Sequence, residues 1–328
     1  MKENSGYIYL REINEQIPRL LGLLDRNPLS CTYGCFDRQY WHYRTSDFAC
    51  ARSQEAVLTL ALLYNNKSTK YYQSPLVLEW INAALNFWVK IQNKNGSFSE
   101  WYPKENSFVA TSFSTYAISE TLLLLKDKIR NKAKIIRALE KSCNWLMNKK
   151  ETTVQNQEAG SILALFNVYL LTGNLEYRNS ARRKLLSLMQ KQTKEGWFYE
   201  YGGPDIGYLS LTIDYLAKYY QKSKDENAFR MASRAVDFIS YFIHPNLTFG
   251  GEYASRNTEY LIPHGFEILS QRNKKAVAIS NAIKESLKNK SSISPQSLDD
   301  RYLTYVGYTW LQAAQDAKNI QTKLILEP

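Results

Sequence analysis

The 328-residue sequence has no apolar run long enough to cross a membrane. Its longest such run, Val57 to Tyr64 with a single Thr, falls far short of the roughly 20 residues that a spanning helix needs. The N-terminal residues also lack the apolar core of a secretory signal. We therefore expect no membrane span and a cytoplasmic location, or a periplasmic one if a leader was removed before this numbering began.

Common catalytic and cofactor motifs are missing as well. The sequence contains no nucleotide-binding glycine loop, no HExxH, no GxSxG and no Asp-rich motif of the kind that binds diphosphate and magnesium. These absences argue against kinase, dehydrogenase, serine hydrolase and ionising terpene synthase activities. They also lead us to expect no cofactor.

Cysteine and histidine are scarce, with four and three residues. Cys31, Cys35, His42 and Cys50 form the pattern C-x3-C-x6-H-x7-C, and three thiolates with an imidazole are a ligand set for tetrahedral zinc. The spacing is not one of the standard zinc pairs. We expect free cysteines and no metal, with a zinc site or a disulfide in this segment as the alternatives.

The formal charge of +11 favours a polyanionic partner. The Lys and Arg residues are spread along the predicted helices, without a recognisable nucleic-acid-binding module, so we expect no nucleic acid. Aromatic residues are abundant, with 24 Tyr and 7 Trp. Their faces stack on sugar rings and hydrocarbon, and phenol hydroxyls bond to polar substituents.

Apolar periodicity predicts helices throughout and no convincing strand. Helices with one polar face alternate with helices that are apolar nearly all round, which are typical of outer and buried inner helices. The pairs are expected at about 7–25 with 53–64, 77–94 with 110–127, 133–149 with 157–172, 175–192 with 207–221, 225–242 with 259–271, and 275–288 with 300–316. This repeat predicts an all-α (α/α)6 toroid of six helical hairpins, with an inner ring of apolar helices, as one domain over residues 1–328.

The connections are unequal in length. Links from outer to inner helices are long, at about 26–52, 95–109, 193–206, 243–258 and 289–299. In antiparallel hairpins these links share one rim, and long loops grouped on one rim are where function usually resides. The inner helices also begin at this rim, so their positive dipole ends face whatever binds there.

One turn motif recurs in these loops. The pattern Q-x3-G-x-F-x-E followed by an aromatic residue begins at Gln92 and again at Gln192, and a looser copy follows Phe249. We expect its Gly to make a tight turn, its Phe to plug the bundle and its Glu–aromatic pair to face the rim.

The segment from His244 to Glu267 carries an unusual density of titratable and hydrogen-bonding side chains for a turn-rich loop. A second cluster surrounds Tyr208, and Arg256 is a cation that could lower the pKa of that phenol. The competing interpretations are structural: Asn156 and Asp300 can cap helices, and a lone histidine usually stabilises the fold.

With the helix pairs, the Q-x3-G-x-F turns and the rim aromatics assembled, the chain resembles the α/α-toroid carbohydrate-active enzymes. It looks closest to the helical domain of the heparinase II/III-like and alginate-lyase-like polysaccharide lyases. The resemblance covers most of the chain at the level of architecture. It implies β-elimination on uronate sugars, in which an Asn with His or Arg neutralises the carboxylate and a Tyr, sometimes with His, moves the C5 proton.

The resemblance implies specific roles in this sequence. Asn156 and Arg256, with Asn257 as a further candidate, would hold the carboxylate, and Tyr208, aided by His264 or alternatively by His42, would move the proton. The other expected contacts with an acidic glycan substrate are His42, Trp41, Asp37, Glu200, Trp101, Glu252, Tyr253, Asn257, Tyr260 and Asp300. The alternatives are a uronyl C5-epimerase, a glycoside hydrolase, a non-catalytic glycan-binding toroid and an isoprenoid-handling toroid. The sequence carries no prediction of oligomeric state.

Overall fold

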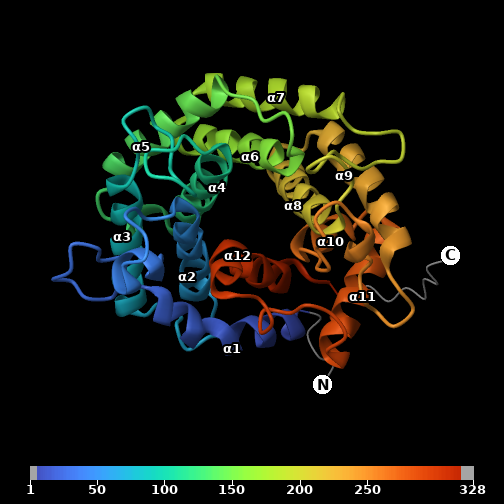
Figure 1. The fold of residues 1–328 in the computed structure, drawn as a ribbon, viewed down its shortest axis with the longest axis horizontal. Coiled ribbons are helices and arrows are strands. Elements are labelled where there is room, and N and C mark those ends of the chain that lie inside the picture. The colour runs from blue at the N-terminus through green and yellow to red at the C-terminus, as the bar shows by residue number, and fades with distance from the viewer. Residues whose placement is uncertain (1–5, 319–328) are drawn as a thin grey trace.

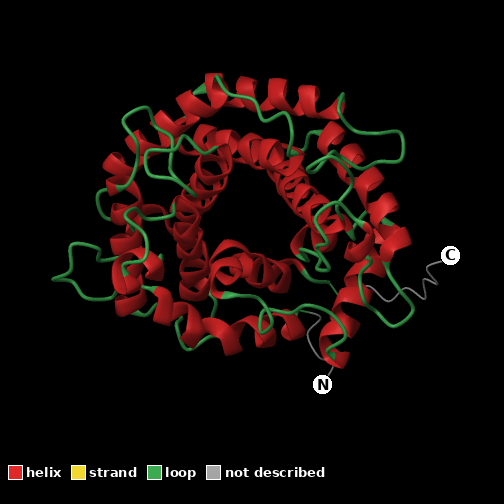
Figure 2. Ribbon diagram, viewed as in Figure 1, coloured by secondary structure: helices red, strands yellow, loops and turns green. Residues whose placement is uncertain are grey.

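The computed structural model describes residues 6–318, in which twelve α-helices form two concentric rings (Figure 1). The outer helices are α1 (Tyr7–Leu23), α3 (Pro75–Lys90), α5 (Lys132–Met147), α7 (Leu175–Met189), α9 (Glu226–Ile239) and α11 (Lys274–Asn289). The inner helices are α2 (Ala56–Asn65), α4 (Phe108–Leu125), α6 (Gln155–Thr172), α8 (Ile206–Ser223), α10 (His264–Leu269) and α12 (Asp300–Asp316). Helices and loops make up the described chain (Figure 2), and the predicted (α/α)6 toroid is confirmed.

The inner ring is closed. Each inner helix contacts the next one along the chain, and α12 in turn contacts α2. The first outer helix, α1, also packs along α12, so the two ends of the described chain lie side by side (Figure 1). The repeats therefore form a ring and not an open solenoid.

The inner helices are buried on nearly every side, as their apolar sequences predict. Among the described residues, only Phe108–Lys128 is long and apolar enough to span a membrane, and 78% of that window is buried inside the protein. Most of this segment is α4, which packs between α2 and α6 in the inner ring. Its apolar composition is thus explained by its place in the core.

Two elements differ from expectation. The inner helix predicted over 259–271 is limited to His264–Leu269, because Pro263 precedes it and a proline disfavours helical geometry in the residue before it. The helix predicted from residue 53 begins at Ala56, after a single turn of 3-10 helix over Ala51–Glu55. Both changes lie at the rim of the long loops.

The recurrent turn motif fastens successive hairpins together. Gly96 and Gly196 have φ values of +94° and +104°, and a Cβ at either would lie 2.3 Å from a carbonyl oxygen of the next outer helix. The Gln92 amide donates to the carbonyls of Gly96 and Ala138, which joins the turn to α5. The motif phenylalanine Phe98 is fully buried. The tight turn and the buried Phe agree with the prediction.

Side chains fill the interior of the ring. Tyr116, Tyr215 and Tyr308 come from α4, α8 and α12, and the Tyr116 ring lies 5.3 Å and 5.9 Å from the other two. The Lys218 ammonium lies 5.1–5.9 Å from all three ring centres and 2.5 Å from the Asp214 carboxylate. A buried ion pair inside an aromatic cage thus links three inner helices.

This arrangement predicts that Lys218→Ala strongly destabilises the protein. Lys218 is 2% exposed, so its loss leaves a buried carboxylate without its nearest cation, which typically costs about 3–5 kcal/mol. Urea denaturation measures the change. Lys132→Ala is the control, because its exposed 3.5 Å pair with Asp127 should contribute less than about 1 kcal/mol. Equal losses in the two variants would contradict the structural role of the cage.

Candidate functional site

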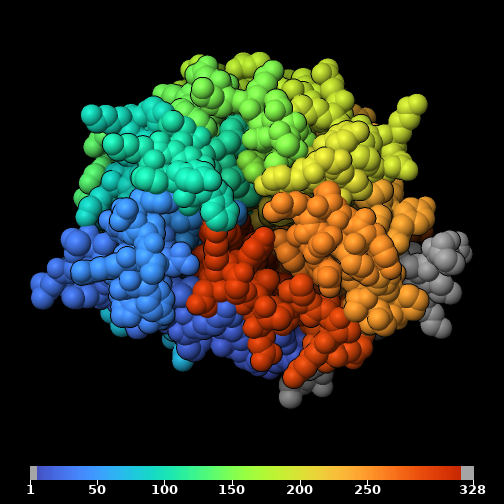
Figure 3. All heavy atoms as spheres, in the orientation of Figure 1, coloured from blue at the N-terminus to red at the C-terminus, as the bar shows by residue number. Residues whose placement is uncertain are grey.

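A cavity of about 530 Å³ lies at the rim where α4, α6, α8 and α12 begin. Figure 3 looks onto the molecule along the ring axis and shows segments from several hairpins converging over its centre. The long loops therefore surround a cavity, as predicted. Its polar and aromatic lining includes Arg52, Glu100, Trp101, Asn156, Tyr201, Tyr208, Arg256, Tyr260, Arg301, Tyr302 and Tyr305.

Three of the four predicted catalytic residues line this cavity: Asn156, Tyr208 and Arg256. Asn156 and Tyr208 lie in the first turns of α6 and α8, and Arg256 lies in the loop before α10. The fully buried Asp205 joins two of these elements. Its carboxylate accepts the backbone N–H groups of Tyr208 and Arg256, both at 3.0 Å. One carboxylate thus caps α8 and places Arg256 beside Tyr208.

Arg256 is the cation best placed to receive an anion. Its guanidinium is near enough to the Tyr208 phenol to lower the pKa of that group, and it lies 4.4 Å from the Tyr201 ring centre. Within residues 6–318 its guanidinium forms no ion pair, whereas Arg52 and Arg301 both lie within 4 Å of Glu100. An acidic ligand in the cavity would meet an uncompensated guanidinium at Arg256.

The Tyr208 phenol is protonated at neutral pH. Burial raises its pKa well above the ordinary value, the neighbouring Tyr302 and Tyr201 raise it further, and the hydrogen bond from Arg256 offsets only part of this. Arg256 lowers this pKa as expected, but desolvation outweighs the effect of one exposed cation, so the pKa is raised overall. In the resting protein Tyr208 is a proton donor.

Asn156 is held by Glu200. The Asn156 side-chain amide and backbone N–H donate to the two carboxylate oxygens of Glu200, at 2.7 Å and 2.8 Å. Glu200 is fully buried and lies outside the cavity, and burial raises its pKa above the ordinary value. It orients Asn156, so the expectation that it contacts substrate is corrected. Of the two motif glutamates, Glu200 points into the protein, whereas Glu100 lines the cavity at the rim.

His264 lies too deep to assist Tyr208. Its Nδ1 is 3.5 Å from Asp214, which is six residues after Tyr208 on α8 and therefore about 9 Å further from the rim. Its Nε2 is 2.8 Å from Asp316, in the last turn of α12. The proposed partnership of His264 with Tyr208 is thus wrong, because the short α10 places this histidine inside the ring.

Two predicted residues of the first long loop face elsewhere. The Trp41 indole donates to the Leu23 carbonyl at 2.8 Å, and His42 is exposed with its ring beside those of Trp41 and Tyr43. Neither residue lines this cavity or the smaller one beside it. Both therefore pack within the loop and not against a ligand site, contrary to expectation.

A second cavity of about 260 Å³ adjoins the first and is lined by the predicted residues Asp37 and Asp300. Asp37 accepts the backbone N–H of Cys50 at 2.8 Å, and Asp300 pairs with Arg19 at 2.6 Å. Both carboxylates are thus already bound by the protein while they face the cavity.

The cysteines around His42 occupy separate environments. Cys31 is exposed, Cys35 is buried, and the Cys50 thiol lies 3.5 Å from the Tyr305 hydroxyl. All are free thiols. Among residues 6–318 no group of three or more His, Cys, Asp or Glu is arranged to hold a metal ion.

The His244–Glu267 segment contributes less than expected. Of its predicted contacts only Arg256 and Tyr260 line the cavity, and Glu252, Tyr253 and Asn257 are exposed outside both cavities. Several of the segment's other polar groups bind elsewhere in the protein, as Thr258 does to Gly207 and Glu267 does to Tyr9 and Lys284.

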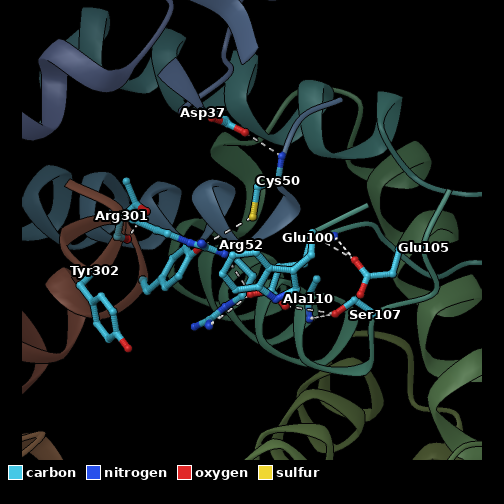
Figure 4. A network of polar contacts seen from close by, with 12 residues as sticks. Asp37, Cys50, Arg52, Glu100, Glu105, Ser107, Ala110, Arg301 and Tyr302 are labelled. Atoms are coloured by element: carbon cyan, nitrogen blue, oxygen red, sulfur yellow. Dashed lines mark hydrogen bonds and ion pairs between the residues drawn. The ribbon is translucent and has the colours of Figure 1, made fainter. Parts of the chain in front are cut away.

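The structure adds cavity residues that sequence analysis missed: Arg52, Arg301 and Tyr305. The Arg52 guanidinium lies 2.9 Å from Glu55 and 3.8 Å from Glu100, and Arg301 lies 3.3 Å from Glu100 (Figure 4). Arg301 also stacks 3.7 Å from the Trp101 ring centre. In the sequence, the indication for these residues is that they lie where inner helices begin, on the rim predicted to carry function.

The comparisons with known proteins concern the fold alone. No family model and no curated protein matches this sequence. Among solved structures, the polysaccharide lyase BACCELL_00875 is similar, with a TM-score of 0.58 and 11% identity, covering 93% of this chain and 96% of that one. The ent-copalyl diphosphate synthase from Streptomyces platensis is also 11% identical, covering 80% of this chain and 50% of that one, but its TM-score of 0.49 is too low to bear on function.

His264 generates a prediction about stability. Burial lowers its pKa, but the carboxylates of Asp214 and Asp316 beside the ring outweigh burial and raise the pKa above the ordinary value. Its protonated form therefore adds stability that is complete below the unfolded pKa of about 6.5 and disappears as pH rises through the higher folded pKa.

We expect the difference in unfolding free energy between the native protein and His264→Gln to shrink as pH rises through this window. Urea denaturation at a series of pH values measures the difference. A difference that stays constant across the window would show that His264 is neutral in the folded protein.

Proposed function

We propose that the protein is a carbohydrate-active enzyme that cleaves an acidic, uronate-containing polysaccharide or oligosaccharide by β-elimination. The observation that carries this proposal is the Arg256 guanidinium, which forms no ion pair among the described residues and lines one cavity with Tyr208 and Asn156. The likeness of the fold to a polysaccharide lyase supports it.

In this proposal Arg256 binds the substrate carboxylate together with the Asn156 amide. Of the two N–H groups on that amide, Glu200 engages one, and the other is available to the substrate. Neutralising the carboxylate makes the C5–H bond more acidic, because charge that develops on the sugar is stabilised by the same donors.

Tyr208 is the group that moves the proton. As a phenolate it takes the C5 proton, the bond from C4 to the glycosidic oxygen breaks as the C4–C5 double bond forms, and the new phenol protonates the leaving oxygen. The tyrosine ends as the phenolate from which the step began. Because its resting form is the phenol, the cycle first requires that the phenol proton is lost to solvent. The adjacent Arg256 stabilises the phenolate form.

The cavity lining argues against one rival function, and the product of the reaction distinguishes the other two. Three guanidiniums and several carboxylates make the cavity unsuitable for an isoprenoid chain, which needs a dry apolar surface. A uronyl epimerase would use the same proton abstraction without forming an unsaturated product. A non-catalytic glycan-binding toroid would bind the same sugars and release them unchanged.

We predict that Tyr208→Phe lowers turnover by about a thousandfold, within the range for loss of a general acid–base group, with little change in binding. The test follows the ultraviolet absorbance of the unsaturated product with a panel of uronate polysaccharides, and calorimetry follows binding. Tyr199→Phe is the matched control, because Tyr199 is 52% exposed and outside both cavities. Turnover by Tyr208→Phe at the native rate would remove Tyr208 from the mechanism.

The raised pKa of Tyr208 predicts that kcat/KM increases with pH from neutral into the alkaline range. Below that pKa the phenolate fraction grows about tenfold per pH unit. The test is to measure initial rates at a series of pH values at which the protein remains folded. A bell-shaped profile centred near the histidine range would point to a different base.

A further inference from the structure

The two rim cavities form parts of one cleft. They share Glu100, Trp101, Arg301 and Tyr305 as a common wall. The Trp101 indole is 58% exposed at this wall and is held by the Arg301 guanidinium, 3.7 Å from its ring centre. A ligand that extends from the Tyr208 cavity across this wall would meet an aromatic surface and then enter the second cavity.

The second cavity holds donors that the fold does not use. The Arg38 guanidinium donates to the Gly22 carbonyl at 3.2 Å and lies 5.1 Å from the Tyr43 ring centre. Its Nε is buried and has no hydrogen-bond partner, and within the described residues no carboxylate pairs with Arg38. Because this Nε is enclosed by the protein, a ligand oxygen in the cavity would accept hydrogen bonds from the other guanidinium N–H groups of Arg38, which lines the cavity.

The other lining groups suit a sugar. Asp37 and Asp300 present carboxylate oxygens to the cavity, and Tyr43, which is 59% exposed, presents an aromatic ring. Guanidinium donors, carboxylate acceptors and an aromatic face together match the alternating hydroxyls and C–H faces of a sugar ring. The reacting site, in contrast, contains Asn156, Tyr208 and Arg256 and lies wholly in the larger cavity.

We propose that the second cavity binds further sugar units of the same glycan chain, so that the substrate is an oligomer or polymer with more than two units and not a disaccharide. This inference rests on the proposed function, because it takes the larger cavity as the place of reaction. Arg38 and Tyr43 are then specificity-determining residues for chain length.

The test measures how affinity depends on chain length. Calorimetry is carried out with alginate and hyaluronan oligosaccharides of two and of six units, in the Tyr208→Phe background, with the oligosaccharides checked afterwards to be intact. Arg38→Gln and Tyr43→Ala are compared with two controls outside both cavities. These are Arg230→Gln, on an exposed face of α9, and Tyr241→Ala, at a side chain that is 71% exposed.

The proposal expects affinity for six units to exceed affinity for two, and the two cavity variants to lose about tenfold for six units with no loss for two. Controls should match the parent. Length-dependent binding that Arg38→Gln and Tyr43→Ala leave unchanged, or an equal loss for both lengths, overturns the second subsite while the proposed function stands. Absence of binding by any oligosaccharide overturns the proposed function itself and this inference with it.

Discussion

Contact between α12 and α2 closes the ring, and the burial of the inner helices depends on that closure. An inner helix that is apolar on nearly every side needs neighbours on both flanks as well as an outer helix behind it. The same closure assembles the site, because Arg52, Asn156, Tyr208, Arg256 and Arg301 come from five hairpins and line one cavity. Folding and the construction of the cleft are thus one event in this protein.

Carboxylates around the cleft are mostly bound by the protein itself. Asp205 accepts the N–H groups of Tyr208 and Arg256, Glu200 holds Asn156, and Glu105 accepts the backbone N–H groups of Glu100 and Trp101. Fixed acids of this kind shape the loops while they leave the Arg256 guanidinium without a counter-ion. The cavity favours an anion because its carboxylates are bound by protein groups, whereas the Arg256 guanidinium forms no ion pair among the described residues.

Burial raises the pKa of two side chains on α8, but with different net results. Near the rim it raises the pKa of Tyr208 and keeps the phenol protonated beside a ligand cavity. Deeper in the ring, Asp214 stays charged, because Lys218 and His264 lower its pKa more than burial raises it. A partnered charge can be buried as structure, whereas a poorly solvated phenol next to a free cation is suited to proton transfer.

Sequence periodicity alone determined the alternation of outer and inner helices, the rim that carries the long loops, and the tight turns at Gly96 and Gly196, because these features depend on local patterns of burial and backbone geometry. The resemblance to polysaccharide lyases led to the prediction of Asn156, Tyr208 and Arg256, and the structure places all three around one cavity. Only the tertiary structure decided that Glu200 points inward, that His264 pairs with Asp214 and Asp316, and that Arg52 and Arg301 reach the cavity. These outcomes follow from contacts between helices that are far apart in the chain. Helical spacing determines on which face of a helix a side chain lies, but it does not determine which residue of another helix packs against that face once the ring closes.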